Sequence, residues 1–131
     1  MLKIFLDVSF VPVDKNTGMV RPADIIKEIT SMTCLVTVML ANNETGVIQP
    51  IKSIFEKIRE INRNTERAAA ILTHTDAAQA FGKIPVSVQD LDVDYMTIVG
   101  HKVNNTHRNL KFVADFFCKK GDCLISLNIL R

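Results

Sequence analysis

The feature that most constrains the fold is an alternation of short apolar runs with segments of helical periodicity. Residues 34–40 form a near-continuous apolar, β-branched run, which favours a strand buried on both faces. Further strands are predicted at residues 68–73 and 95–99, with a short one at 8–13. The alternation predicts an α/β fold with a mostly parallel sheet and covering helices.

Two helices are predicted between these runs. The clearer one follows Pro50, because apolar residues recur there at the spacing of one helical face: Ile51, Ile54, Phe55, Ile58 and Ile61. The other begins at Pro22, since proline suits the first turn of a helix and Asp24 suits its positive end. Residues 62–67 are polar and are expected to form a solvated connection.

Composition excludes several classes of function. At 131 residues the chain fits one domain, and a hydrophobic content of 47% argues against disorder. The formal charge of +2 and the lack of a basic cluster with interleaved aromatic residues make a nucleic-acid partner unexpected. No apolar run is long enough to span a membrane, and Asp7 interrupts a run too short for a signal peptide.

Cysteine and histidine placement also limits the chemistry. The three cysteines, Cys34, Cys118 and Cys123, are odd in number and irregularly spaced, which predicts reduced thiols in the cytosol and no disulfide frame. The three histidines lack the spacing of metal ligands, so no metal site is expected.

Two charged residues follow predicted strands and suggest a site. Asp76 lies just after one strand and Lys102 just after another, where open α/β sheets bind their ligands. A lysine Schiff base, together with an aspartate facing the pyridinium nitrogen, is how proteins hold pyridoxal 5'-phosphate (PLP). Each residue also has an ordinary interpretation: the aspartate as a helix cap or turn residue, and the lysine as a surface residue.

Three polar residues near these strand ends extend the candidate site. Gln79 follows Asp76 by three residues and either faces solvent or donates to a cofactor oxygen. Asn43 either holds its own turn or bonds the same edge of a cofactor ring. His101 either contacts a phosphate or packs, and His74 is expected to be a strand-end residue.

Three segments resemble the class V aminotransferase family: residues 41–46, 74–83 and 97–102. Within the family they are similar to the group of cysteine desulfurases and selenocysteine lyases. Thr45 and Val99 favour the selenocysteine lyases, since desulfurases usually carry isoleucine and serine at these positions. The resemblance runs from about residue 8 to residue 102.

The resemblance implies a PLP enzyme of fold type I that converts L-selenocysteine to L-alanine and releases selenium. A cysteine desulfurase is the alternative. Lys102 matches the Schiff-base lysine that later moves the α-carbon proton, and Asp76 matches the partner of the pyridinium nitrogen. Gln79 and Asn43 match groups that bond the phenolate oxygen, and His101 matches a residue beside the phosphate. The family is homodimeric.

The sequence also departs from the family. Residues 1–102 match only the central part of the PLP-binding large domain, and residues 103–131 form a divergent tail of unknown structure. The family's phosphate-binding Gly-Thr loop and ring-stacking histidine lie upstream of the matched segments, and its mobile cysteine has no counterpart. Val99 removes one phosphate contact. A truncated and catalytically inactive product is therefore also expected.

Overall fold

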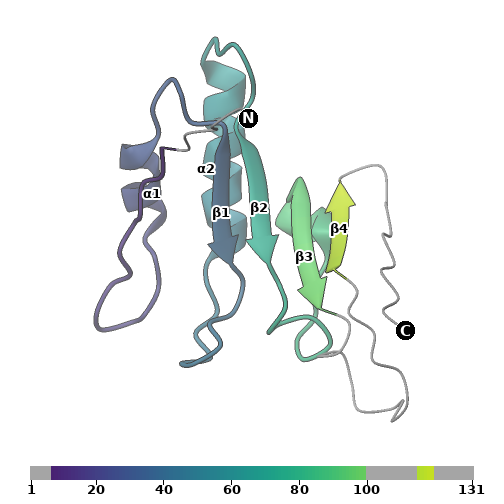
Figure 1. Cartoon of the computed structure of the whole chain (residues 1–131). Helices are drawn as coiled ribbons and strands as arrows, with labels where there is room; N and C mark the ends of the chain where they lie inside the picture. The colour runs from purple at the N-terminus through teal and green to yellow at the C-terminus, as the bar shows by residue number, and fades with distance from the viewer. Residues whose placement is uncertain (1–6, 100–114, 120–131) are drawn as a thin grey trace, which may run out of the picture.

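The computed structural model describes residues 7–99 and 115–119 (Figure 1). Its helices are α1 (Pro22–Glu28), α2 (Ile51–Asn64) and α3 (Val88–Leu91). Its strands are β1 (Leu35–Met39), β2 (Leu72–Asp76), β3 (Tyr95–Val99) and β4 (Asp115–Lys119). They form one sheet in the order β1-β2-β3-β4, in which β1, β2 and β3 are parallel and β4 pairs antiparallel with β3. The predicted α/β fold with a mostly parallel sheet is confirmed.

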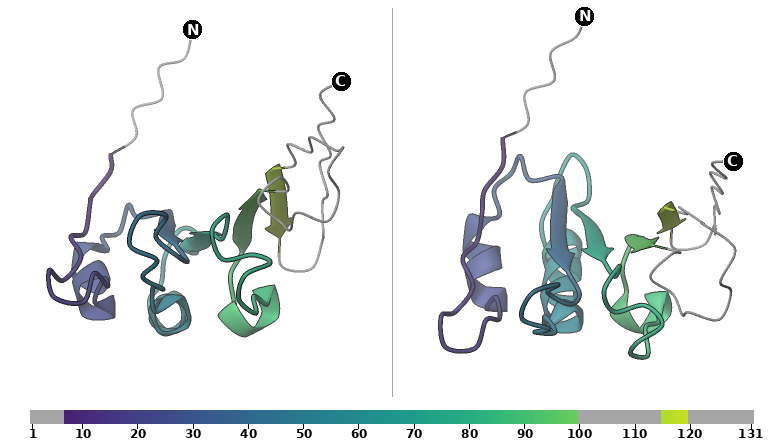
Figure 2. Two further views of the ribbon diagram at one scale, coloured as in Figure 1. Left: turned by 90° about the horizontal axis from the view of Figure 1, so that it is seen from below. Right: turned by 60° about the horizontal axis from the view of Figure 1, so that its bottom comes forward.

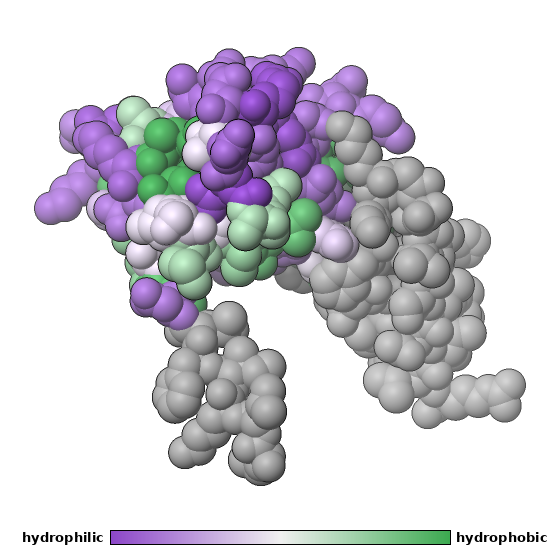
Figure 3. All heavy atoms as spheres, turned by 90° about the horizontal axis from the view of Figure 1, so that it is seen from above, coloured by the Kyte–Doolittle hydropathy of each residue, from purple (hydrophilic) through white to green (hydrophobic). Residues whose placement is uncertain are grey.

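The helices of the described part all lie on one face of the sheet (Figure 2). The other face is open, and Leu35, Met39 and Leu72 on it are 49%, 40% and 41% exposed. The prediction that residues 34–40 are buried on both faces is therefore wrong, because the helices described here cover a single side. Seen from the end at which β1 and β2 begin, hydrophilic residues cover the helical side, while pale and green residues reach the surface beside the sheet (Figure 3).

The core lies between α2 and the sheet. The apolar stripe predicted for this helix is confirmed, because Ile51, Ile54, Phe55 and Ile58 are 1% exposed or less. They pack in one cluster with Met96 of β3 and with residues that flank β2 and β3: Ile71, Ala77, Ala80 and Val93. Each large side chain buried in this way contributes about 1.5–3 kcal/mol. Burial of the α2 stripe is thus what holds the helix against the sheet.

Two predicted strands need correction. Residues 8–13 form no strand, because Pro12 lacks an N–H donor and no neighbouring strand of the described chain pairs with the segment, which leaves Phe10 90% exposed. The strand predicted at residues 68–73 lies a few residues later, as β2. The pairing of β2 with β1 begins where Leu72 lies opposite Leu35. This pairing, and not the run of alanines at residues 68–70, therefore sets the start of β2.

The connection after α2 is exposed at residues 63–66, as predicted, but the side chains at its two ends bond to neighbouring segments. The helix continues to Asn64, and the Asn62 side chain bonds both backbone groups of Ile71: its amide donates to the carbonyl at 2.9 Å and its oxygen accepts from the N–H at 2.9 Å. Arg67 Nη2 donates to the carbonyls of Thr30, Ser31 and Thr33. These bonds tie the connection to the start of β2 and to the turn before β1.

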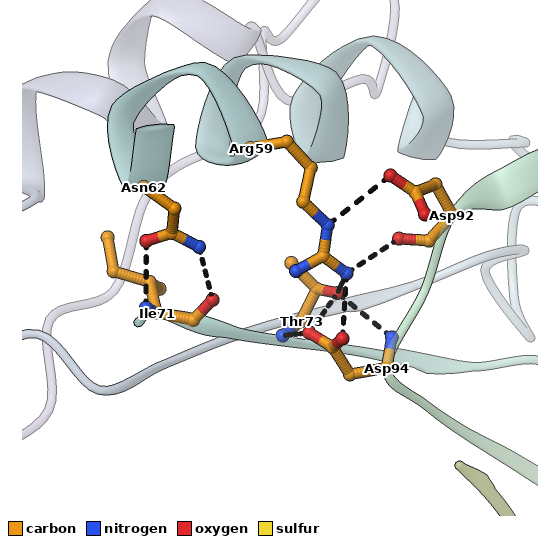
Figure 4. Close-up of polar contacts among 6 residues, drawn as sticks. All are labelled: Arg59, Asn62, Ile71, Thr73, Asp92 and Asp94. Atoms are coloured by element: carbon orange, nitrogen blue, oxygen red, sulfur yellow. Dashed lines mark hydrogen bonds and ion pairs between the residues drawn. The ribbon is translucent and has the colours of Figure 1, made fainter. Parts of the chain in front are cut away.

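A partly buried polar network joins α2 to the starts of β2 and β3 (Figure 4). Arg59 Nη2 lies 2.8 Å from Asp94 Oδ1, donates to the Asp92 carbonyl at 2.9 Å and to Thr73 Oγ1 at 3.1 Å. Asp94 Oδ2 accepts from the Thr73 N–H at 2.8 Å and from its hydroxyl at 3.0 Å. Burial alone would raise the pKa of Asp94, but the hydrogen bonds from Arg59 and Thr73 outweigh it and lower that pKa.

Candidate active site at the carboxyl ends of the parallel strands

The candidate site lies at the edge of the sheet where β1, β2 and β3 end (Figure 1). Asp76 is the last residue of β2, and its carbonyl accepts from the Leu40 N–H at 2.8 Å. The Ala77 N–H donates to the Thr97 carbonyl at 2.8 Å. Backbone hydrogen bonds thus align the three strand ends on both sides of Asp76, at the position where ligands bind in open α/β sheets.

One oxygen of the Asp76 carboxylate is fixed by a hydrogen bond, and the other is available to a ligand. Its Oδ1 accepts from the Ala78 N–H at 2.8 Å, whereas Oδ2 has no partner among the described residues. The side chain is exposed on the open face of the sheet. A fixed anion with one free oxygen can accept a hydrogen bond from a protonated ring nitrogen, so this residue fits the pyridinium of PLP.

Gln79 lies in the turn after β2 and is half-buried. Its Oε1 accepts from Lys83 Nζ at 3.1 Å, which orients the amide and leaves the NH₂ group without a partner in the described chain. The NH₂ group of Gln79 is therefore available to donate to a cofactor oxygen.

Asn43 lies at the exposed tip of the loop between β1 and α2. Of the two interpretations left open by the sequence, the turn-holding role belongs to its neighbour: Asn42 Oδ1 accepts from the N–H groups of Glu44 and Thr45 at 2.9 and 2.8 Å. Gly46, with a φ of 72°, supplies the left-handed residue that closes this loop. The Asn43 side chain has no hydrogen bond within the described part of the molecule and is free to bind a ligand.

Lys102 and His101 lie outside the described residues. The strand before them is β3, whose bounds Tyr95–Val99 match the prediction and whose last residue lies three positions before the lysine. The roles of Lys102 and His101 therefore remain predictions.

His74 is not the strand-end residue that the sequence suggested. It lies in the middle of β2, with its side chain on the open face between Thr37 of β1 and Thr97 of β3. Its Nδ1 lies 2.6 Å from the Thr37 hydroxyl and its Nε2 lies 2.9 Å from the Thr97 hydroxyl. Burial lowers the pKa of His74, and the negative charge of Asp76 opposes that shift in part.

Sequence reasoning missed Asn42, the His74 contacts and the Arg59 network. The spacing of Asn42 and Thr45 was a usable signal, since an asparagine three residues before a threonine is typical of such a turn. The His74 contacts and the Arg59 network depend on which segments are neighbours in the fold, and a single sequence does not reveal this. Within residues 7–99, no cluster of three His, Cys, Asp or Glu side chains could hold a metal ion, and no helix is long and apolar enough to cross a membrane.

Comparison with known proteins identifies the class. The family model for aminotransferase class V matches residues 3–106, so the chain belongs to the class V aminotransferase family. It is 54% identical over 98 residues to the selenocysteine lyase of Rattus norvegicus and 52% identical over 99 residues to that of Homo sapiens. It is also 45% identical over 96 residues to a probable mitochondrial cysteine desulfurase of Dictyostelium discoideum.

Coverage of these relatives is uneven. The two lyase alignments take in 73% and 72% of this chain but only 23% and 22% of the relatives, so the chain spans less than a quarter of their length. Among solved structures, a NifS-like protein matches with a TM-score of 0.63 and 38% identity, covering 72% of this chain and 24% of that one. A structure described as SspA in complex with cysteine matches with a TM-score of 0.61 and 32% identity, covering 73% and 25%. The described sheet and helices are thus part of a larger family fold.

Proposed function

We propose that this chain carries the cofactor-binding centre of a PLP-dependent selenocysteine lyase, which converts L-selenocysteine to L-alanine and releases selenium. The observation that carries the proposal is Asp76: it ends β2 with one carboxylate oxygen fixed by the Ala78 N–H and the other free. Similarity to selenocysteine lyases supports the choice of substrate. The proposed substrate is an amino acid. Nucleic acid has no part in the proposal, because the sequence has no basic cluster.

The proposed roles of the residues follow from their chemistry. PLP, when bound, supplies an electron sink for the electron pair left at the substrate α-carbon. Asp76 would hold a proton on the ring nitrogen, because an opposite charge at contact favours the protonated form by about 1–3 pK units, or about 1.4–4 kcal/mol. Gln79 and Asn43 would donate to the phenolate oxygen and orient the ring. By the family resemblance, Lys102 would hold the cofactor covalently and move the α-carbon proton, and His101 would contact the phosphate; both residues lie outside the described part of the chain.

We propose that the isolated chain of 131 residues has no lyase activity of its own. It spans less than a quarter of its relatives, and catalysis needs a preorganised phosphate site, ring stack and thiol as well as the residues named above. A cysteine desulfurase is the second candidate, supported by the 45% identity to the Dictyostelium protein. The cytosol is the proposed location, because the odd and irregular cysteines suit a reducing compartment.

One titration tests both the cofactor and the activity. The purified chain is mixed with PLP and followed by absorbance for the band of lysine-bound PLP, with Lys102→Ala as the control. We expect the band in the wild type and its loss in the variant. An equally strong band in Lys102→Ala would remove the lysine from its role, and no band in either would leave the chain as a non-catalytic α/β module. Release of selenium from L-selenocysteine in the same tube would overturn the proposed inactivity.

A further inference from the structure

We infer that His74 is a positioning residue for the cofactor site, an inference that rests on the proposed function. Its imidazole is the central member of a hydrogen-bonded row that crosses three parallel strands, one step before Asp76 on the same face. The row holds the strand ends in alignment and engages the hydroxyl of Thr97, the register partner of Asp76, which leaves the free carboxylate oxygen for the cofactor.

The row draws one side chain from each strand. Thr37 is the register partner of His74 on β1, and its hydroxyl lies 2.6 Å from Nδ1. On the other side Nε2 reaches the hydroxyl of Thr97 on β3 at 2.9 Å. Neighbouring strands lie about 4.8 Å apart, so a flat ring with a nitrogen on each edge can span both gaps at once. A threonine at position 74 could bond only one neighbour, and a valine could bond neither.

The row ends beside Asp76. Thr97 is the register partner of Asp76 on β3, so its hydroxyl is the polar group on that strand placed to compete for the carboxylate. In the tautomer with Nε2 unprotonated, the Thr97 hydroxyl donates to His74 and not to Asp76. The carboxylate then keeps one partner, the Ala78 N–H, and retains an oxygen for a ring nitrogen. Loss of His74 would therefore free Thr97 to bind Asp76 and would weaken the alignment of β1 and β3 with β2.

The charge of the row suits this role. Burial lowers the pKa of His74 and so favours its neutral form, which lessens competition with a pyridinium for Asp76. On the open face of the three parallel strands, the other titratable side chains are Asp76 on β2 and the phenol of Tyr95 on β3, and β1 contributes none. The antiparallel strand β4 places Lys119 opposite Tyr95 and Asp115 opposite Val99 in the register.

Amide hydrogen exchange on the chain without cofactor tests the alignment. The reporters are the N–H groups of Leu40 and Ala77, which bond across the strand ends, and the N–H of Leu72, which bonds Cys34 at the far end of the same ladder. We expect Thr37→Val to speed exchange at Leu40, and Thr97→Val at Ala77, by about fivefold, with Leu72 unchanged. Each valine should also shift the imidazole ¹⁵N resonances of His74, because loss of one hydroxyl partner changes the tautomer balance of the ring. Equal exchange in wild type and both variants, or equal acceleration at all three amides, would overturn the inference.

A PLP titration then tests the effect on the cofactor site. We expect His74→Leu to weaken PLP binding about tenfold, while Tyr95→Phe on the same face leaves it unchanged. Wild-type affinity in His74→Leu would refute the positioning role. Failure of the wild-type chain to bind PLP would instead refute the proposed function, and the exchange data would still decide whether the row aligns the strands.

Discussion

Replacement of Arg59 by alanine should reveal how strongly this partly buried network holds α2 to the sheet. The Arg59 and Asp94 side chains are 19% and 18% exposed, so Asp94 would lose its cation in a largely desolvated site. Breaking a fully buried pair costs about 3–5 kcal/mol. Asp94 keeps both hydrogen bonds from Thr73, and the pair is partly exposed, so we expect a loss of about 2–4 kcal/mol.

Urea unfolding followed by circular dichroism measures this loss. A domain of this size is stable by about 5–15 kcal/mol, so the variant should show a midpoint lower by about 1–2 M. Lys57→Ala is the matched control, because it removes a positive charge from the exposed side of the same helix and should change stability by about 0.5 kcal/mol or less. A double-mutant cycle with Asp94→Ala should give a coupling of about 1–3 kcal/mol. Equal losses in Arg59→Ala and Lys57→Ala would refute the reasoning.

Three further predictions use the same unfolding assay. Phe55→Ala empties a position that is 0% exposed and should cost about 3–5 kcal/mol; a loss below 1 kcal/mol would show that α2 does not pack as described. Asn62→Ala leaves both backbone groups of Ile71 without their partner and should cost about 1–3 kcal/mol, whereas Asn64→Ala in the exposed last turn should cost little. The pKa of Asp94 is lowered in the folded state, so its contribution is complete above the ordinary value of 3.8 and is lost as the pH falls below it toward the folded pKa. Asp94→Asn should flatten the dependence of stability on pH in that range, and an unchanged slope would contradict the assignment.

Local patterns in the sequence predicted local structure well. The stripe from Ile51 to Ile58 predicted α2 and its buried face, because helical periodicity depends on residues within two turns. The apolar run before Gly100 predicted β3 with its observed bounds. The order of strands and helices was enough to predict a parallel sheet. The antiparallel strand β4 was not predicted, because the tail shows no pattern typical of a strand.

Features that depend on distant neighbours were not predictable. One face of β1 is open because the helices lie on the other face, and the apolar run carries no information on where helices pack. Arg59 reaches partners that are 14 and 33 residues away in the sequence, and His74 reaches Thr37 at a separation of 37 residues. At the candidate site the sequence correctly placed Asp76 at the end of a strand, but it could not show that Ala78 fixes one of its oxygens.

The account depends most on Asp76 facing a protonated ring nitrogen, and comparing two ligands tests this directly. The affinity of the chain is measured by absorbance for PLP and for its 1-deaza analogue, which lacks that nitrogen, in wild type and in Asp76→Ala. We expect the variant to bind PLP about 10- to 1000-fold more weakly and the analogue as the wild type does. An equal loss for both ligands, or no loss for PLP, would contradict the assignment of Asp76 to the ring nitrogen.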